Sequence, residues 1–448
     1  MILIFAIITV LMGGSMFFIS RDKKIALMFI GCMTLSLLRM DIPLFNTAKF
    51  LLVGSFLLSE FNNWKAMMIR WTKSPVGRIM LIVLLSVLLC ILFSPHLHAI
   101  NNARGFLQDE LLLKYFALGY AFFSIRNENN LKTLIQYSII PMFVLTLFGV
   151  VNLLDHRSFF VTEMMSNWSS SSFSSVNELA GDKFMDADRF RVQAMFSNPF
   201  DYGYICSLCL IIYIYGYIKK MISKYLFSIL SLCCSFGILL CGCRTVIFCS
   251  ILGVCTIILF SYKLGKSMTS SLVAVSIAVV AYMTVPVVNE NVNAMTTIFS
   301  DRSGREYGGS SIEMRSIQFA TVLSLIQESP AFGRGVHFFN LDMGWKDGGR
   351  GLKDQRLFGL EGVYLSYLLE RGLVGYLLYL YVWIFLLIYL YKRRHFSREL
   401  AAFGISVWVL YTAFANMTGE LLSVYPTLII IGSVLGAFIN NEKSKNVK

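Results

Sequence analysis

Arginine residues gather in the few polar stretches that interrupt an otherwise apolar chain. Six of them fall in two long polar segments, at about 155–200 and 289–371, or in one bare turn between two apolar runs: Arg189, Arg191, Arg244, Arg305, Arg315 and Arg334. A guanidinium group binds phosphate bidentately and stays protonated. On one side of a membrane, such a set would hold a diphosphate and offset the negative charge that it gathers as it leaves. A soluble anion that passes through would suit the set nearly as well.

Two of these arginines stand in positions that call for an anion. Arg244 has no neighbouring acid in the sequence, and a charge at membrane depth costs at least about 2.5 kcal/mol without a partner. Snorkelling to the interface is the alternative. Arg315 lies one turn into an expected helix that a Ser310-to-Glu313 capping box begins, where the helix dipole disfavours a cation. An ion pair with Glu313 or Asp301 is the alternative there.

The polar segments also contain a glycine turn and several acids. Gly333-Arg334-Gly335 follows Pro330, and its glycines permit a tight reversal close to a ligand. His337 could act as a base or a ligand, but its isolation in the sequence favours an ordinary loop residue. The acids that could serve as a base are Asp109, Asp201, Glu361, Glu370 and Glu420. We favour Glu361, because apolar neighbours at the membrane surface would raise its pKa toward that of a useful base. A helix-capping role for Glu361 is equally compatible.

The sequence predicts no metal site. Asp186-Ala187-Asp188 superficially resembles a metal-binding pair, but it sits among other acids in a Ser-rich segment and is read as a solvated charge run. Cys206 and Cys209 form a C-x-x-C inside an apolar run, where they are read as small helix residues.

The composition describes the scaffold that must position these residues. Of the 448 residues 56% are hydrophobic and 15% charged, against about 25% charged in a soluble protein. Many apolar runs reach roughly 17 to 21 residues, enough to cross a bilayer. The net charge of +13 comes from basic residues in alternate connectors. This positive-inside pattern orients a membrane protein and argues against nucleic acid as a partner.

We therefore expect an all-α, polytopic integral membrane protein with one membrane domain over 1–448. About 12–13 transmembrane helices are expected, near 3–19, 25–40, 44–61, 79–94, 110–125, 133–154, 201–218, 225–242, 245–262, 268–288, 372–391, 399–416 and 424–440. The N-terminus is expected outside and the C-terminus inside. The two long segments, 155–200 and 289–371, then form large extracytoplasmic loops, the second with a surface helix near 311–329.

Four sequence pieces in this order resemble a known family. They are RVQAMFSNPFDYG from Arg191, CGCRT from Cys241, MRSIQFATVLSLIQESPAFGRGVHFF from Met314 and EGVYLSYLLERGLVGYL from Glu361. Together they are similar to the successive signatures of the bacterial O-antigen ligase/polymerase superfamily, over about 190–380. The family pattern has glycine at Ala194 and asparagine at Phe200.

The resemblance implies a GT-C-like membrane glycosyltransferase without a metal or other cofactor. It implies that Arg191, Arg244 and Arg315 contact a lipid-linked diphosphate, with Arg244 and Arg315 taking part in catalysis. Gly333 and Gly335 would shape the turn. Glu361 stands where the ligases have a histidine that helps to activate the acceptor, and this departure favours a polymerase.

The expected function is polymerisation of undecaprenyl-diphosphate-linked repeat units into surface polysaccharide, O-antigen or capsule. The expected place is the bacterial inner membrane, with the site facing the periplasm or cell exterior. A chain-length regulator and a flippase are possible partners. The alternatives are a ligase that transfers the glycan to lipid A core or protein, and a flippase or transporter. A transporter would carry polar residues in mid-helix, whereas here polarity is concentrated in two loops.

Overall fold

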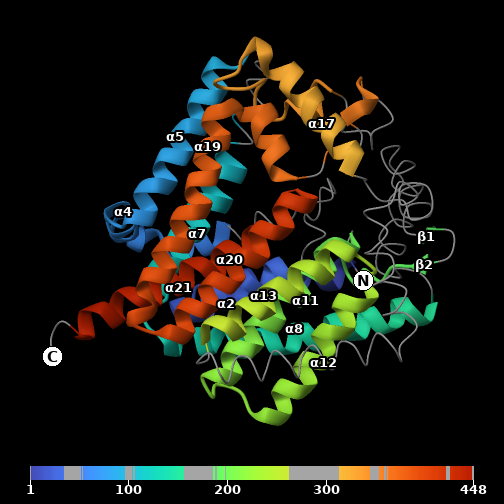
Figure 1. Ribbon diagram of the computed structural model, residues 1–448. Coiled ribbons are helices and arrows are strands. Elements are labelled where there is room, and N and C mark those ends of the chain that lie inside the picture. The colour runs from blue at the N-terminus through green and yellow to red at the C-terminus, as the bar shows by residue number, and fades with distance from the viewer. Residues whose placement is uncertain are drawn as a thin grey trace.

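The computed structural model describes residues 2–34, 52, 54–95, 103, 106–155, 185–186, 189–196, 198–261, 312–343, 353–357, 360, 362–419 and 424–445. Helices make up nearly all of this part of the chain (Figure 1). Their bounds are α1 Ile2–Ser15, α2 Arg21–Thr34, α4 Trp64–Lys73, α5 Pro75–Phe93, a π-helical segment Phe106–Phe116, α7 Ala117–Ser124, α8 Glu128–Asp155, α11 Pro199–Ile218, α12 Lys224–Leu240, α13 Arg244–Ser261, α17 Ile312–Leu325, α18 Phe338–Leu341, α19 Val363–Lys392, α20 Arg398–Thr418 and α21 Val424–Lys445. Two-residue strands, β1 (Met185–Asp186) and β2 (Arg189–Phe190), pair antiparallel.

Six helices within the described ranges are long and apolar enough to cross a membrane. They are Pro75–Phe93, Glu128–Asp155, Pro199–Ile218, Arg244–Ser261, Val363–His395 and Arg398–Thr418, and two shorter apolar helices are Lys224–Leu240 and Val424–Phe438. The all-helical, multi-pass architecture is thereby confirmed. The expected span at 268–288 lies outside the described residues, and that at 44–61 is described only at 52 and 54–61.

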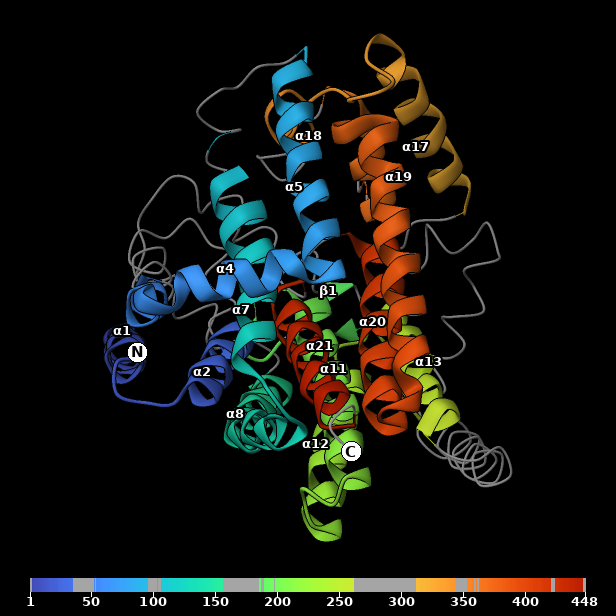
Figure 2. The same cartoon turned by 90° about the vertical axis from the view of Figure 1, so that its left-hand side faces the viewer.

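One connector departs from the expectation. The basic stretch between the spans expected at 44–61 and 79–94 is helical and forms α4, which lies crosswise to α5 in Figure 2. Met67 and Trp71 of α4 are fully buried, so an amphipathic face holds it on the bundle. Ser74 then ends α4 and caps α5, because its Oγ accepts a hydrogen bond of 2.9 Å from the Gly77 amide.

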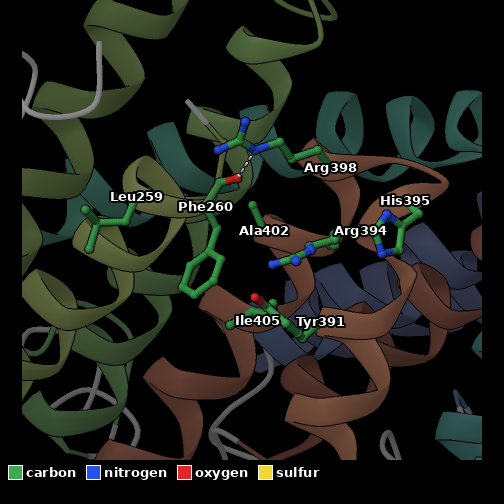
Figure 3. Close-up of a pocket in the computed structure, with 9 residues that line it drawn as sticks. Leu259, Phe260, Tyr391, Arg394, His395, Arg398, Ala402 and Ile405 are labelled. Carbon is green, nitrogen blue, oxygen red and sulfur yellow. Dashed lines mark hydrogen bonds between the residues drawn. The ribbon is translucent and has the colours of Figure 1, made fainter. Parts of the chain in front are cut away.

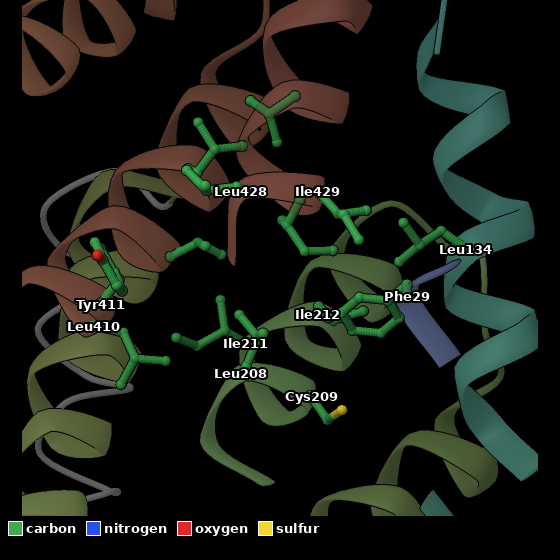
Figure 4. Packing of buried hydrophobic residues seen from close by; sticks show 14 of the residues in the cluster. Phe29, Leu134, Leu208, Cys209, Ile211, Ile212, Leu410, Tyr411, Leu428 and Ile429 are labelled. Carbon is green, nitrogen blue, oxygen red and sulfur yellow. The ribbon is translucent and has the colours of Figure 1, made fainter. Parts of the chain in front are cut away.

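The main core lies where α11, α13, α20 and α21 meet, with α2 and α8 alongside (Figure 4). α13 and α20 are antiparallel, because Arg398 Nε at the start of α20 donates to the Phe260 carbonyl at the end of α13 (2.7 Å). They cross closely at Gly253, whose carbonyl accepts from Ser406 Oγ. A Cβ at Gly253 would lie 3.4 Å from Leu410 Cβ, so a small residue allows this close approach.

α19 begins at Val363 rather than near 372, and it is broken at Gly372, where φ is 63° and ψ is −162°. Its first part, 363–371, belongs to a second hydrophobic core that is separate from the first. That core contains Val322, Ile326, Phe338, Phe339, Met343, Leu357, Leu365, Leu368 and Leu369. We call α17, residues 326–343 and residues 363–371 the cap. Figure 2 shows α17 and α18 at the upper end of α5 and α19.

Candidate functional site

Arg191 and Arg244 lie at the same turn. The backbone amide of Val192 donates to the Leu240 carbonyl (2.9 Å), which joins the segment after β2 to the end of α12. Gly242 in this turn has a φ of +63°, and a Cβ there would be 3.1 Å from Arg191 Cγ. Arg244 begins α13 two residues later. Two arginines far apart in the sequence are thus brought together at the positive end of the α13 dipole, a favourable place for an anion.

The segment that carries Arg191 is fixed by burial and by caps. Ala194 adopts a φ of 49°, a left-handed conformation that glycine takes more easily. The Ala194 carbonyl accepts a hydrogen bond of 3.0 Å from Asn152 Nδ2, and its side chain is fully buried. Asn198 Oδ1 caps α11 by accepting from the Phe200 amide (2.9 Å). The backbone geometry explains why the related sequence pattern has glycine at this position.

Arg315 lies on α17 and reaches the end of α20. Its Nη2 donates to the Met417 carbonyl (3.2 Å), in the last turn of α20, where the helix dipole favours a cation. Gly362 contacts the same end, because a Cβ on Gly362 would be 2.8 Å from the Asn416 carbonyl oxygen. Arg315 and the residue after Glu361 therefore meet at one helix end, although Glu361 itself is outside the described residues.

The α13–α20 crossing places Arg244 and the Arg315 contact with Met417 at similar distances along the two helix axes, on the same side of the crossing. Arg244 is nine residues before Gly253, and Met417 is seven residues after Leu410, which packs against Gly253. At about 1.5 Å per residue, Arg244 and Met417 lie roughly 13 Å and 10 Å from the crossing, in the same direction. In Figure 1, α17 and the β1–β2 pair lie to the right, while α4 and the C-terminus lie on the left.

Arg334 faces its own loop. Its guanidinium pairs with Glu328 and lies 5.1 Å from the centre of the Phe338 ring, and the residue is 9% exposed. Its carbonyl accepts from Ser94 Oγ at the end of α5 (2.7 Å). The structure thus places Arg334 within the packing of the cap and does not bring it to Arg191, Arg244 or Arg315 by any described contact.

The Gly333-Arg334-Gly335 turn is inserted into the break of α19. In an unbroken helix, the amides of Leu373 and Val374 would bond to the carbonyls of Leu369 and Glu370. Here those amides donate to Pro330 and Ala331 (2.9 and 3.1 Å), and the two carbonyls accept from Arg334 and Gly335 (2.9 and 3.1 Å). Four bonds to one loop replace two within the helix, so these two amides and two carbonyls keep hydrogen-bond partners at the break. We call this junction the latch.

The latch requires two glycines in contact. A Cβ on Gly333 would lie 2.5 Å from the Gly372 nitrogen, and a Cβ on Gly372 would lie 2.5 Å from the Gly333 nitrogen. α5 closes the junction, since Phe332 stacks on Phe93 with ring centres 5.2 Å apart. Gly333 and Gly335 were predicted to shape the turn after the loop helix, and both have positive φ there (72° and 115°). The contacts of this turn join the loop to α19.

A buried charged cluster lies beside the latch, and the sequence analysis did not identify it. Glu110 Oε1 accepts from Arg371 Nη2 (2.7 Å) and from Lys114 Nζ (3.0 Å). The Arg371 guanidinium lies 4.0 Å from the centre of the Tyr367 ring. The side chains of Glu110, Lys114 and Arg371 are 8–11% exposed. An acid and a lysine four residues apart within an apolar run were the available signal.

The remaining predicted residues are not brought to Arg191, Arg244 or Arg315 by any described contact, or lie outside the described residues. Asp201 is buried at the start of α11, and Glu370 Oε1 accepts from the Phe339 amide at α18 (3.4 Å). Arg356 pairs with Asp354 (2.7 Å), and this hydrogen bond lowers the pKa of the Asp354 carboxyl. Arg305 and Glu420 are not described, and of Asp109 and Arg189 only the backbone is. Within the described ranges, no three His, Cys, Asp or Glu side chains gather as metal ligands.

A comparison with protein-family models matches residues 229–380 to the family described as O-antigen ligase. The predicted resemblance to the O-antigen ligase/polymerase superfamily is thereby confirmed over that segment. It implies glycosyl transfer of the ligase or polymerase type. The matched segment contains Arg244, Arg315, the latch and the cap. No curated protein matches the chain.

Proposed function

From the match to the O-antigen ligase family, we propose that this protein polymerises undecaprenyl-diphosphate-linked oligosaccharide repeat units at the outer face of the cytoplasmic membrane. The observation that carries the proposal is the convergence of Arg191 and Arg244 at one turn, with Arg315 anchored at a similar height on the end of α20. Three guanidinium groups from three separate elements then surround one anionic leaving group.

The proposed reaction moves one glycan between two lipid carriers. A sugar hydroxyl of the incoming repeat unit attacks the anomeric carbon of the growing chain, and the bond from that carbon to the diphosphate oxygen breaks. The hydroxyl proton passes to Glu361. This residue directly precedes Gly362, which contacts the end of α20. Arg191, Arg244 and Arg315 stabilise the charge that develops on the departing diphosphate, which is the role of preorganised donors in group transfer. No metal takes part in the proposed reaction.

A ligase is the second candidate, and the family description favours it. In that case the acceptor is lipid A core or a protein rather than another repeat unit. The test incubates the purified protein with one defined lipid-linked repeat unit and separates the products by length. Dimers and longer chains support the polymerase, whereas product formed only after lipid A core is added establishes the ligase.

The arginines are tested by substitution with lysine, which keeps the charge but loses bidentate binding. Arg191→Lys, Arg244→Lys and Arg315→Lys should each lower turnover by about 10- to 100-fold, since removal of one such donor costs up to about 10²–10³. Arg356→Lys is the matched control. Arg356 lies in the same polar segment as Arg315, 289–371, but it pairs with Asp354. Full-length polymer from all three variants would exclude the diphosphate role.

The base is tested separately by Glu361→Gln, a neutral side chain of the same shape. Turnover should fall by about 10²-fold or more if Glu361 accepts the proton, while binding of the lipid-linked substrate stays unchanged. Wild-type turnover of this variant would leave Glu361 with a structural role only.

A further inference from the structure

A hollow lies at the end of α13 and α20 that is opposite to Arg244 and Met417. Its volume is about 400 Å³, and it is lined by the last turn of α13, the α19–α20 connection and the first turns of α20 (Figure 3). Among the lining residues are Leu259, Phe260, Arg394, His395, Arg398 and Ile405. None of the catalytic or diphosphate-binding residues proposed above lines it.

The cationic side chains at this hollow are held in position. Arg398 Nε donates to the Phe260 carbonyl (2.7 Å), and the Arg394 guanidinium lies 3.9 Å from the centre of the Tyr391 ring. Figure 3 shows both arginines facing the side of α13 that bears Phe260. Among the described residues that line the hollow none is acidic, so their charge complements an anion.

The other part of the lining is apolar. Leu259, Phe260 and Tyr391 are 51%, 37% and 41% exposed, and Ala402 and Ile405, which are buried, form the apolar wall on the side of α20. The three exposed residues belong to the last turns of α13 and α19, helices that are long enough to cross a bilayer. Cations at the helix ends and apolar side chains beyond them match an amphiphile that has an anionic head and hydrocarbon tails.

We propose that this hollow binds an anionic phospholipid of the adjoining leaflet. Its phosphodiester lies between Arg394 and Arg398, and one acyl chain runs along Leu259, Phe260 and Tyr391. A free phosphate would satisfy the two guanidinium groups alone and would leave the apolar surface unused. The bound lipid connects the ends of α13, α19 and α20, and α13 and α20 are the two helices that carry the arginine site at their opposite ends.

The experiment measures binding and stability of the full-length protein in mild detergent. Phosphatidylglycerol, phosphatidylcholine and inorganic phosphate are titrated in turn, while the midpoint of thermal unfolding and the lipids retained in native mass spectra are recorded. Phosphatidylglycerol should raise the unfolding midpoint and remain bound, because a ligand of the folded state stabilises it by mass action. Equal effects from phosphatidylcholine would overturn the anionic head, and equal effects from inorganic phosphate would overturn the lipid.

Two variants locate the site. Arg394→Gln should weaken retention of phosphatidylglycerol about fivefold, and Arg394→Gln with Arg398→Gln about 25-fold, from about 1 kcal/mol for each cation. Arg393→Gln is the matched control, because the Arg393 guanidinium lies on the Tyr389 ring (3.6 Å) and does not line the hollow. Because Arg398 also fixes the Phe260 carbonyl, the single Arg394 variant decides the result if the double variant fails to fold. Unchanged retention in Arg394→Gln contradicts the proposal.

Discussion

Two glycines, Gly333 and Gly372, occupy positions where the backbone leaves no space for a side chain. Gly333 and Gly372 both have positive φ, and a Cβ on either would meet backbone nitrogen atoms at 2.5 Å. A flexible neighbour can move away from an added methyl group, but a hydrogen-bonded backbone cannot. The two glycines are therefore required by contact as well as by conformation.

We predict that Gly333→Ala and Gly372→Ala each lower the free energy of unfolding by at least about 2 kcal/mol, from the left-handed penalty together with the backbone contact. Thermal unfolding of the purified variants measures the loss. Gly14→Ala is the control, since it lies in α1 with no atom within 4 Å of the added Cβ, and it should not destabilise the protein. An unchanged free energy of unfolding in both Gly333→Ala and Gly372→Ala would contradict the contact geometry.

The sequence identified residues of the candidate site by type but not by partner. Arg191 and Arg244 were selected as arginines in polar turns, and both are found against the turn at Gly242. Arg334 was selected for the same reason, yet Glu328 and Phe338 already contact its side chain. An arginine that pairs within its own loop and one that lies against the turn of another segment have the same local sequence signal, so only the folded chain distinguishes them.

At the scale of elements, the cluster around Glu110 links the π-helical segment to α19. One carboxylate serves two cations there, Lys114 and Arg371. Removing the carboxylate leaves two buried positive charges together, which is the costly way to break a buried pair. Removing Lys114 leaves a balanced pair of Glu110 and Arg371.

We predict that the effect of Lys114→Met on the free energy of unfolding depends on the residue at position 110. In the wild-type background it should alter the free energy of unfolding by less than about 1 kcal/mol, whereas Glu110→Gln alone should cost about 3–5 kcal/mol. Added to Glu110→Gln, Lys114→Met should restore part of that loss. The measurement is a double-mutant cycle on thermal or denaturant unfolding. Equal costs of Lys114→Met in both backgrounds would exclude the charge balance described here.

Helices were predictable where one apolar run made one straight helix. α11, α12, α13 and α20 begin and end within a few residues of the expected spans. α4 was missed because its basic residues were read as a connector, although Met67 and Trp71 lie four residues apart and are both buried. The start of α19 was missed because the stretch after Gly362 continues as helix and breaks only at Gly372. The partners that stabilise this break, 330–335, lie in another segment and have no local signal.

At the scale of the whole molecule, the protein has two cores of unequal size. The larger one is formed by the helices of the membrane bundle, and the smaller one belongs to the cap. The cap is joined to the bundle by α19, by α5 and by the Arg315 contact with α20. Separate cores can open separately when few contacts cross between them.

We predict that Leu365→Ala loosens the cap without loosening the bundle. Leu365 is fully buried in the smaller core, and such a substitution costs about 2–5 kcal/mol. Amide hydrogen exchange should speed up in residues 312–343 and 363–369, while α11 keeps its protection. Leu208→Ala, a fully buried change in α11, is the reciprocal control and should affect the bundle. Uniform loss of protection in both variants would show one cooperative unit.

The division of the cap core between two stretches of sequence also sets an order of assembly. Val322 and Ile326 are synthesised well before Leu365, Leu368 and Leu369, which complete their core. At about 5–20 residues per second, the interval from Val322 to Leu369 is roughly 2–9 s. During that time Val322 and Ile326 lack the part of the chain that will cover them. The cap core can therefore be completed once the first part of α19, residues 363–371, has been made, before α20 and α21 of the main core are synthesised. Until then its earlier apolar residues are exposed to aggregation and proteolysis.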